Sequence, residues 1–349
     1  MKLKRLWAIF KARNYEFFRD RSAFGWNFIF PFLLVGGFAL IFGGEGRKEY
    51  KVGIFPLAQA QLAAGIQGVP PRFLETQYVE FIAFEDRQTA FNKLMHHKID
   101  FLLLAGSTPY QYWVSTTSPR GYFVEKIFKS SLVSEADSRL SDRREVKGRE
   151  IRYIDWFFPG ILAMNMMFSA LWGVGYIVVR YRKNGVLKRL KATPLTALEY
   201  LAAQTLSRIF LLMFTLVVVW VGCDLVFSFQ VEGSYVDLFI VFFMGGVSLT
   251  SLGLLIASRG SSEEFTSGIL NFITWPMMFL SEVWFSLEGS PQWIKLAAKI
   301  FPLTHMLTAA RKVMNDGANL FDIAPELLVL ALMITVFLSL GAGLFSWRK

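Results

Sequence analysis

Within the long apolar stretches of the sequence, the candidates for a polar function are four side chains, Asn165, Asp224, Asn271 and Glu282. Polar and charged groups are costly in hydrocarbon, so within a membrane span they are candidates for contact with a transported molecule. Asp224 and Glu282 fall near the ends of their stretches, where water or snorkelling relieves that cost. For these two residues, a structural role and a substrate-facing role both stay open.

A proline lies in the same stretch as Asn271. Pro276 removes a backbone hydrogen bond and predicts a kink in the helix. A kinked wall is typical of a movable transport path, although kinks are also frequent in static spans. We therefore take Asn165, Asn271, Pro276 and Glu282 as candidates for a cargo pathway.

Patterns that indicate catalysis are absent from the sequence. It contains no G-x-x-x-x-G-K-[ST] phosphate loop, no H-E-x-x-H zinc motif and no G-x-S-x-G elbow. His96 and His97 are adjacent, so on a helix they diverge by about 100° and do not easily share a metal. Cys223 is the single cysteine, which excludes an internal disulfide. We predict no catalytic residue, metal or cofactor on this chain.

The most basic stretch is RYRKNGVLKRLKATPLTALEYL, residues 180–201. Six cations occupy its first twelve positions, and the first acid is Glu199. These cations predict contact with anionic lipid at the membrane surface, where a helix would run on through residue 191. Thr193-Pro194 then breaks that helix, and Thr196 with Glu199 has the T-x-x-E spacing of a capping box that starts another. The stretch is predicted to form a short elbow, residues 183–200.

The elements around this elbow are apolar enough for a bilayer. Hydrophobic residues make up 54% of the 349 positions and charged residues 18%, which is unlike a soluble protein. A transmembrane helix needs about 20 mainly apolar residues. Six stretches qualify: 22–44, 156–179, 209–229, 238–257, 265–285 and 327–347. The predicted fold class is a polytopic α-helical membrane protein with six transmembrane helices.

Positive charge flanks these stretches in alternation. Lys and Arg cluster before the first stretch and after the second, Arg259 follows the fourth, and Arg348 and Lys349 follow the sixth. The loop after the third stretch has acids and no cation. Loops rich in cations stay in the cytoplasm, so both termini and the elbow are predicted inside. The net charge of +10 is then explained by membrane topology and by contact with anionic lipid rather than by nucleic-acid binding.

The longest segment between spans, residues 45–155, is predicted outside the cytoplasm. Residues 51–55, 79–84, 100–105 and 110–115 are short and rich in β-branched and aromatic side chains, as strands are. Residues 85–98 and a segment that opens at Pro119 have helical spacing of apolar residues. A small α/β domain is expected, and its residues do not indicate a function.

Two amphipathic regions are predicted at the membrane surface. The first is residues 1–21, an interfacial helix with an aromatic face and basic residues away from it. Its marked residues are Trp7, Phe10, Glu16, Arg19 and Asp20. The second region, residues 290–315, reads as two short helices that open near Pro291 and Pro302 and lie in the outer leaflet.

This order of elements resembles the permease subunits of the type-2 ABC transporter family. The segments that carry the resemblance are FFRDRSAFGWNFIFPFLLV, FFPGILAMNMMFSALWGVGYIVVRYRKNGVLKRLKATPL, NFITWPMMFLSEVWFSLEGSP and FPLTHMLTAARKVMNDG. The resemblance covers nearly all the chain except the α/β domain, where it depends mainly on position and size. Glu282 departs from the pattern, because a small or apolar residue is expected there, and this leaves the substrate class open.

The resemblance implies an exporter in the bacterial inner membrane. Two permease copies or homologues would form the pathway, and separate ATPase subunits would bind ATP and Mg and dock on the elbow. The residues implied in coupling are Leu187, Lys188, Arg189, Leu190, Lys191, Pro194, Leu195 and Glu199, of which the leucines are expected to offer an apolar contact. Cargo would be lipid-like, drug-like or polymeric, and a periplasmic adaptor is a further partner left open.

Two other classes of function are compatible with spans and an α/β domain. A membrane-anchored ligand sensor or scaffold would use the spans only as anchors, but six spans exceed that need and the elbow would lack a purpose. An intramembrane enzyme acting on lipid would need clustered His, Asp or Ser in the spans, which the sequence does not show.

Overall fold

The computed structural model describes residues 3–42, 49–57, 68–95, 98–107, 109–132, 152–259 and 262–344. The chain divides into two compact units. One is helical and comprises Met1–Gly43 and Glu150–Lys349, and the other is Gly44–Arg149. His96 and His97 lie outside the described residues. Within the described ranges, no group of three or more His, Cys, Asp or Glu side chains is placed to hold a metal ion.

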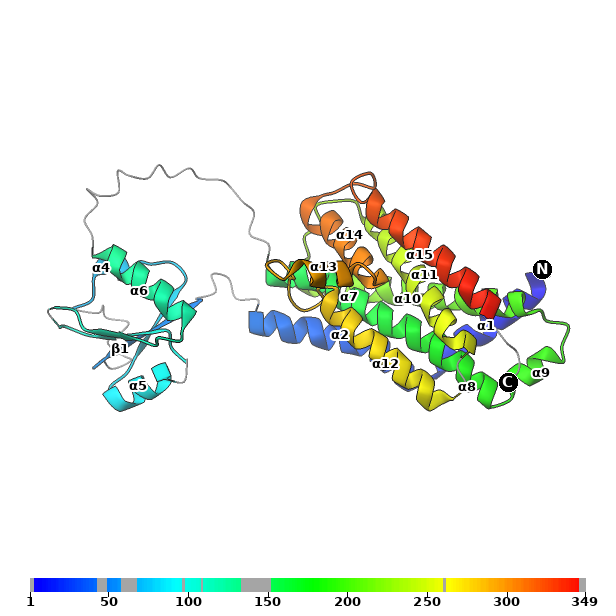
Figure 1. Cartoon of the computed structure of the whole chain (residues 1–349), viewed down its shortest axis with the longest axis horizontal. Helices are drawn as coiled ribbons and strands as arrows, with labels where there is room; N and C mark the ends of the chain where they lie inside the picture. Colours follow the sequence, from blue (N-terminus) through cyan, green and yellow to red (C-terminus); the bar gives the residue numbers. More distant parts are fainter. Residues whose placement is uncertain are drawn as a thin grey trace. The chain divides into compact units, whose positions relative to one another are not determined.

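The helical unit is a bundle of long helices with short helices at its ends (Figure 1). Its elements are α1 (Leu3–Arg19), α2 (Arg21–Phe42), α7 (Tyr153–Ala170), a π-helical segment η2 (Leu171–Tyr176), α8 (Ile177–Lys183), α9 (Val186–Lys191), α10 (Ala197–Phe227), α11 (Tyr235–Arg259), α12 (Glu263–Leu280), α13 (Gln292–Ala298), α14 (Pro302–Asp316) and α15 (Ala324–Leu344). The two short helices predicted after the fifth apolar stretch are confirmed as α13 and α14, with Pro291 and Pro302 at their starts.

Five helical segments of the described chain are long and apolar enough to cross a membrane. They are Phe24–Ile41, Tyr153–Lys183, Glu199–Phe227, Tyr235–Ser258 and Ala324–Leu344. The polytopic helical class is confirmed, but the fifth of the six predicted spans, 265–285, is not among them. Its helix, α12, begins with Glu263 and Glu264 and ends at Leu280, because the chain turns at Glu282, whose φ is 60°.

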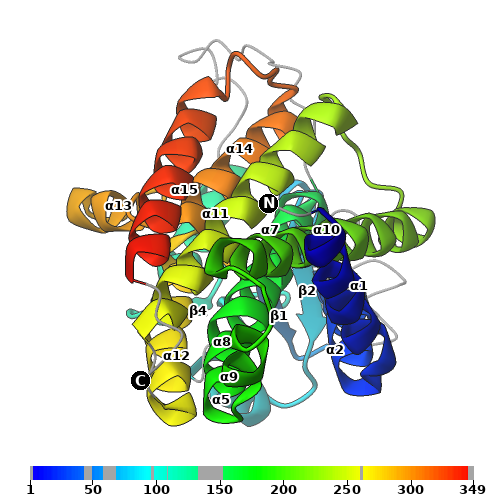
Figure 2. The same ribbon diagram turned by 90° about the vertical axis from the view of Figure 1, so that its right-hand side faces the viewer.

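The long helix built from α7, η2 and α8 lies at the centre of this unit. Nearly all of α7 is buried, from Ile154 to Ala170, and it packs against α2, α10, α11 and α14. The other helices surround it, with α15 along α11 and α1 along α10 (Figure 2). α2 is joined to α7 by Phe38 and Phe157, whose ring centroids are 4.2 Å apart.

The ends of the helices gather in two groups (Figure 1). The start of α1, the end of α15 and the α8–α9 bend lie at one end of the bundle. The start of α7, the end of α2 and the short helices α13 and α14 lie at the other. The described segments with predicted inside cations are therefore on one side of this unit, whereas Lys2, Arg348 and Lys349 lie outside the described residues. In the sequence, the second unit is inserted between α2 and α7, and the end of α2 and the start of α7 both lie at the opposite end of the helical unit.

The second unit is an α/β domain, as predicted. Its sheet has the order β2-β1-β3-β4, in which β1 (Tyr50–Phe55) pairs in parallel with β2 (Val79–Ala83) and β3 (Phe101–Leu104), and β4 (Tyr112–Val114) pairs antiparallel with β3. All four strands lie within one residue of the predicted starts or inside the predicted ranges. Parallel strands need crossover segments, which include α4 (Pro71–Leu74) and α5 (Arg87–Met95).

Both faces of the sheet are covered, because alternate strand residues point to opposite sides. Val52 and Phe101 pack with Phe73 of α4 and Phe128 of α6 (Pro119–Ser131). On the other face, Phe55 and Leu102 pack with Ala90 and Leu94 of α5. In the helical unit, α7 begins at Tyr153, so 153–155 belong to this helix rather than to the segment predicted between the spans.

Candidate functional site

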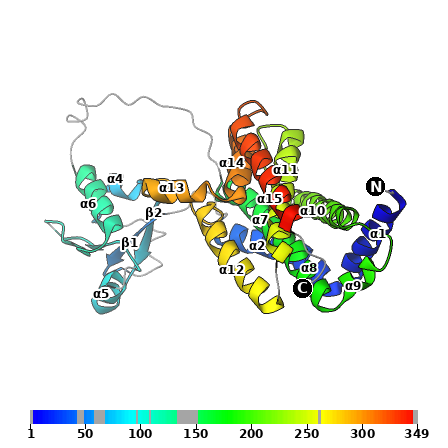
Figure 3. The same cartoon turned by 45° about the vertical axis from the view of Figure 1, so that its right-hand side comes forward.

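The basic stretch forms an elbow of two short helices and a turn. α8 ends at Lys183, Gly185 takes a left-handed conformation with φ 70°, and α9 begins at Val186. The chain changes direction there (Figure 3). The expectation of one helix running through residue 191 is therefore wrong, because a glycine at positive φ ends α8 and the chain restarts as α9.

The apolar side of α9 faces into the protein. Leu187 is completely buried, in a cluster with Val178 of α8, Tyr200 of α10 and Leu254 of α11. Leu190 and Leu195 are half-buried against the same cluster. The predicted contact of Leu187 with an ATPase is wrong, since its side chain is enclosed by its own chain.

The polar side of the elbow is open. Lys188, Arg189 and Lys191 of α9 are exposed, and so is Pro194 in the turn that follows. The outward surface of the elbow is thus cationic, and the leucines fix α9 to α8, α10 and α11. Any partner on this surface would meet positive charge.

The predicted restart of the helix after Pro194 is confirmed. The Thr196 hydroxyl accepts a hydrogen bond from the Glu199 amide at 3.2 Å, and the Glu199 carboxylate accepts one from the Thr196 amide at 3.1 Å. This capping box satisfies two amide groups at the start of α10. Glu199 is only 3% exposed, so it holds the start of α10 and is not part of the open surface.

α1 is fastened to the elbow. The Arg5 guanidinium donates to the carbonyl oxygen of Pro194, and Arg13 donates to both Glu16 and the hydroxyl of Tyr181 in α8. That hydroxyl in turn donates to Glu16. The elbow and α1 are therefore linked at two places by polar contacts.

The amphipathic character of α1 is confirmed, but much of its apolar face covers other helices. The ring of Phe10 meets Phe210 of α10 with centroids 5.7 Å apart. Trp7 stays 51% exposed beside the basic residues, and Arg19 is exposed at the last turn. Asp20 accepts from the Ser22 amide at the start of α2, at 3.0 Å. Contact of the exposed side with lipid stays a prediction.

Two more helices, α11 and α12, are tied to the end of η2 and to α8. The Tyr176 hydroxyl donates to Glu263 in the first turn of α12 at 2.7 Å, and Lys183 lies 3.5 Å from the same carboxylate. Arg182 donates to the carbonyl oxygens of Ala257 and Ser258 in the last turns of α11. A displacement of the elbow would therefore reach α1, α10, α11 and α12.

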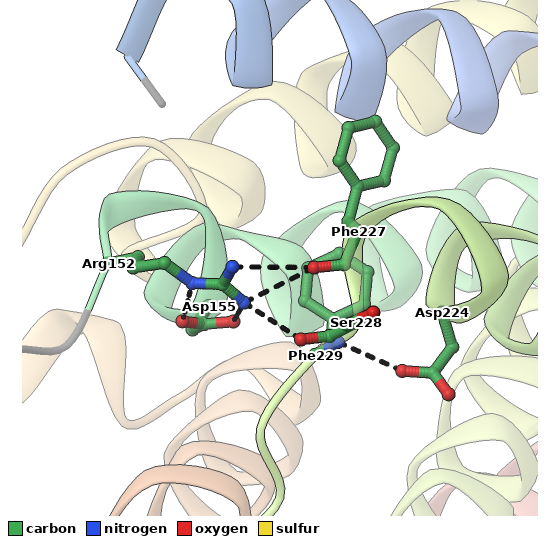
Figure 4. A network of polar contacts seen from close by, with 6 residues as sticks. All are labelled: Arg152, Asp155, Asp224, Phe227, Ser228 and Phe229. Atoms are coloured by element: carbon green, nitrogen blue, oxygen red, sulfur yellow. Dashed lines mark hydrogen bonds and ion pairs between the residues drawn. The ribbon is translucent and has the colours of Figure 1, made fainter. Parts of the chain in front are cut away.

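A polar network closes the opposite end of the bundle (Figure 4). Arg152, just before α7, makes a two-pronged pair with the buried Asp155, with N···O distances of 2.8 and 2.9 Å. The same guanidinium donates to the carbonyl oxygens of Phe227 and Ser228, where α10 ends. Asp224 accepts from the Phe229 amide at 2.9 Å. Asp224 thus has a structural contact, which was one of its two predicted roles.

The four residues predicted to line a cargo pathway are not brought together. Asn165 points to α2 and donates to the Asn27 carbonyl oxygen at 2.9 Å. Asn271 and Pro276 lie exposed on α12, which continues through Pro276 without a break. Glu282 lies in the turn after α12 rather than in a span, accepts from the Leu287 amide at 2.8 Å and is 3.6 Å from Arg311.

Sequence reasoning missed a polar group inside the bundle. The hydroxyl of Ser169 in α7 accepts from Nη2 of Arg208 in α10 at 2.7 Å and donates to Oδ1 of Asn27 in α2 at 2.9 Å. Arg208 precedes the stretch predicted as a span from residue 209. The capping box at Thr196 could have indicated this position. It marks the start of α10, which runs unbroken from Ala197 and carries Arg208 into the bundle.

The bundle of apolar helices with an inserted α/β unit and a basic elbow defines a multi-pass membrane protein. Residues 21–342 match the family described as ABC-2 family transporter protein, and the chain belongs to this family. It is thereby a permease component of the ABC transporter type, as its resemblance predicted.

Three curated relatives have names of the same kind. The chain is 23% identical over 196 residues to the daunorubicin resistance ABC transporter permease protein DrrB1 of Streptomyces coeruleorubidus, covering 55% of this chain and 69% of that protein. It is 26% identical over 201 residues to the inner membrane transport permease YhhJ of Escherichia coli, covering 55% and 52%. It is 25% identical over 196 residues to the "Probable multidrug ABC transporter permease YbhR" of the same species, and the match covers 56% of this chain and 53% of that protein. The match thus spans about half the length of the two E. coli proteins.

Proposed function

We propose that this chain is the membrane subunit of an ATP-driven exporter in the bacterial inner membrane, powered by separate ATPase chains that bind ATP and Mg. The observation that carries the proposal is the construction of the elbow. Its cations point outward, while Leu187 fixes it to the ends of several long helices. A surface that only anchored the chain to lipid would not need this rigid attachment.

Coupling would use the attachment in the following way. An ATPase bound at Lys188, Arg189 and Lys191 moves α9 when two ATPases close around ATP. Leu187 carries that displacement into α8, α10 and α11, and Tyr176 with Lys183 carries it to α12. α1 follows through Arg5 and Tyr181.

The orientation of the chain in the membrane, its second permease subunit and its cargo belong to the same proposal. With α12 as the sixth crossing, both termini and the elbow lie in the cytoplasm and the α/β unit lies outside it. The cation-rich segments that the structure describes share one end of the bundle, and the chain leaves and re-enters the bundle for the α/β unit at the other end. A second permease copy or a homologue completes the pathway. The exposed α12, with Asn271 on an otherwise apolar face, is suited to such a contact. Drug-like cargo is supported by the names of two relatives, and lipid-like or polymeric cargo remains within the proposal.

The test is ATPase docking in a purified complex. A triple variant, Lys188→Gln, Arg189→Gln and Lys191→Gln, removes the outward charge and leaves the Leu187 anchor. We expect weaker copurification of the ATPase, with the largest defect at low ionic strength, where the lost attraction was least screened. The matched control is Lys295→Gln together with Lys299→Gln, exposed cations of the α13 region at the other end of the bundle. Normal ATPase binding and cargo-stimulated hydrolysis in the triple variant would favour an elbow that serves only as a topology anchor.

A further inference from the structure

Arg208 is an arginine without a counter-charge among the residues that the structure describes. It is 9% exposed and makes one hydrogen bond within the described chain, from Nη2 to Ser169. Its Nε is buried and has no hydrogen-bond partner there. A guanidinium stays charged at any physiological pH, and a buried charge with unused donors is costly unless an anion or water meets it.

Two cavities meet at this side chain. One, of about 260 Å³, lies between α1, α2, α8 and α10 and includes Arg13, Arg180, Gln204 and Arg208 in its wall. The other, of about 300 Å³, lies between α2, α7 and α10, and its wall includes Trp26, Phe30, Phe168 and Asn165. The walls of the two cavities have in common Asn27, Trp172 and Arg208. The guanidinium is therefore placed where both spaces reach it.

The two cavities differ in chemistry. The first holds three arginines against the carboxylates of Glu16 and Asp20, and Glu16 is already engaged by Arg13 and Tyr181. The second is lined mainly by aromatic and apolar side chains. A molecule with an acidic group and an apolar body matches both, with the acid at Arg208 and the body against Trp26 and Phe30.

The backbone makes room for Arg208 at one point. A Cβ on Gly173, in the π-helical segment η2, would lie 1.9 Å from Cζ of Arg208. Only a glycine leaves the space that the guanidinium fills, and π-helical turns are frequent at functional sites. The position of the charge is thus built by α10 and η2 together.

We propose that Arg208 binds the acidic head group of an anionic amphiphile, and that its source is a phospholipid of the membrane. Nη and Nε donate to the phosphate, Asn165 and Ser169 lie beside it, and an acyl chain enters the aromatic cavity. The inference is independent of how the ATPase docks, because the site is made by α2, α7, η2 and α10 and uses no exposed cation of α9.

The first experiment is native mass spectrometry of the chain in neutral detergent with added phosphatidylglycerol or phosphatidylcholine of the same acyl chains. We expect preferential retention of phosphatidylglycerol. Arg208→Gln should lower its apparent affinity by about tenfold, the loss expected for one charge-assisted contact. Gly173→Ala, which displaces the guanidinium but keeps the net charge, should do the same. Lys295→Gln, an exposed cation of α13, should change nothing.

A second measurement needs no change to the arginine. Phosphatidylglycerol brominated on its acyl chains should quench tryptophan fluorescence, and Trp172→Phe should remove part of that quenching while the protein stays folded. Inorganic phosphate at millimolar concentration should not compete. Equal retention of the two lipids, unchanged binding in a folded Arg208→Gln protein, or identical quenching in the Trp172→Phe protein would each overturn the proposal. Competition by inorganic phosphate would show that the ligand is a free anion rather than a phospholipid, and would overturn the proposal.

Discussion

The guanidinium of Arg5 donates a hydrogen bond to the carbonyl oxygen of Pro194, which lies 189 positions further along the chain. The contact joins the first turns of α1 to the turn between α9 and α10. It is one of two polar links between α1 and the elbow, the other being the group of Arg13, Glu16 and Tyr181. α1 is consequently attached to the element that an ATPase would move under the proposed function.

Removal of the first link should affect coupling more than stability. Arg5→Gln breaks an exposed contact, so we expect the free energy of unfolding to fall by less than about 1 kcal/mol. Cargo-stimulated ATP hydrolysis in reconstituted vesicles should drop, since α1 no longer follows the elbow. The neighbouring Lys4→Gln is the control, because Lys4 is exposed and makes no described contact. Equal hydrolysis in the two variants would contradict a role for α1 in coupling.

Leu187 and Leu190 should respond differently to substitution. Leu187→Ala leaves a cavity in a completely buried cluster and should cost about 2–5 kcal/mol, seen as a lower unfolding temperature in detergent. Leu190→Ala, half-buried at the rim, should cost clearly less. Equal losses would mean that α9 is not anchored through Leu187.

The network at the opposite end predicts a coupled pair of charges. Arg152→Gln leaves the buried carboxylate of Asp155 without its partner, which should cost about 1–3 kcal/mol of unfolding free energy. Adding Asp155→Asn should recover part of that loss, because the unpaired charge is gone. Thermal unfolding of both single variants and the double variant measures the interaction. Strictly additive losses would show that the pair is not coupled.

Much of the fold could be predicted because its elements have strong local signals. The apolar stretches predicted α2, α10, α11 and α15. Short length with β-branched and aromatic content predicted the four strands, and the T-x-x-E spacing predicted the start of α10. Each of these signals lies within one element. Each element therefore forms where its own residues favour it.

The features that could not be predicted depend on contacts between distant elements. α12 stops at Leu280 because Glu282 turns and meets Leu287 and Arg311, which its apolar composition does not reveal. The burial of Leu187 follows from its packing on α10 and α11. The surroundings of Arg208 come from three helices far apart in sequence. For such positions, residue type alone left the role undecided.

The orientation in the membrane can be checked by labelling. In a Cys223→Ser background, a cysteine at Gln77 in the α/β unit should react with an impermeant thiol reagent in intact cells. A cysteine at Ala192 in the elbow should react only after the membrane is opened. Both positions are exposed, so burial does not limit the reaction. Equal labelling of the two sites in intact cells would refute the proposed topology.

The α/β unit should be dispensable for docking of the ATPase. Replacement of residues 44–149 by a short flexible linker should leave ATPase copurification intact and impair export, since the unit is inserted at the end of the bundle opposite the elbow. The variant's unfolding temperature serves as the control for an intact bundle. Loss of ATPase binding in a folded, inserted variant would contradict this division of roles.

The contact between Phe38 and Phe157 has an evolutionary consequence. These rings, 4.2 Å apart, join α2 to α7 on either side of the inserted unit, so the bundle has its own closure at the point of insertion. The unit is then a module inserted into a bundle whose helices pack together without it. Among descendants of one ancestral bundle, the unit could change in length or sequence without altering the packing of α2 on α7.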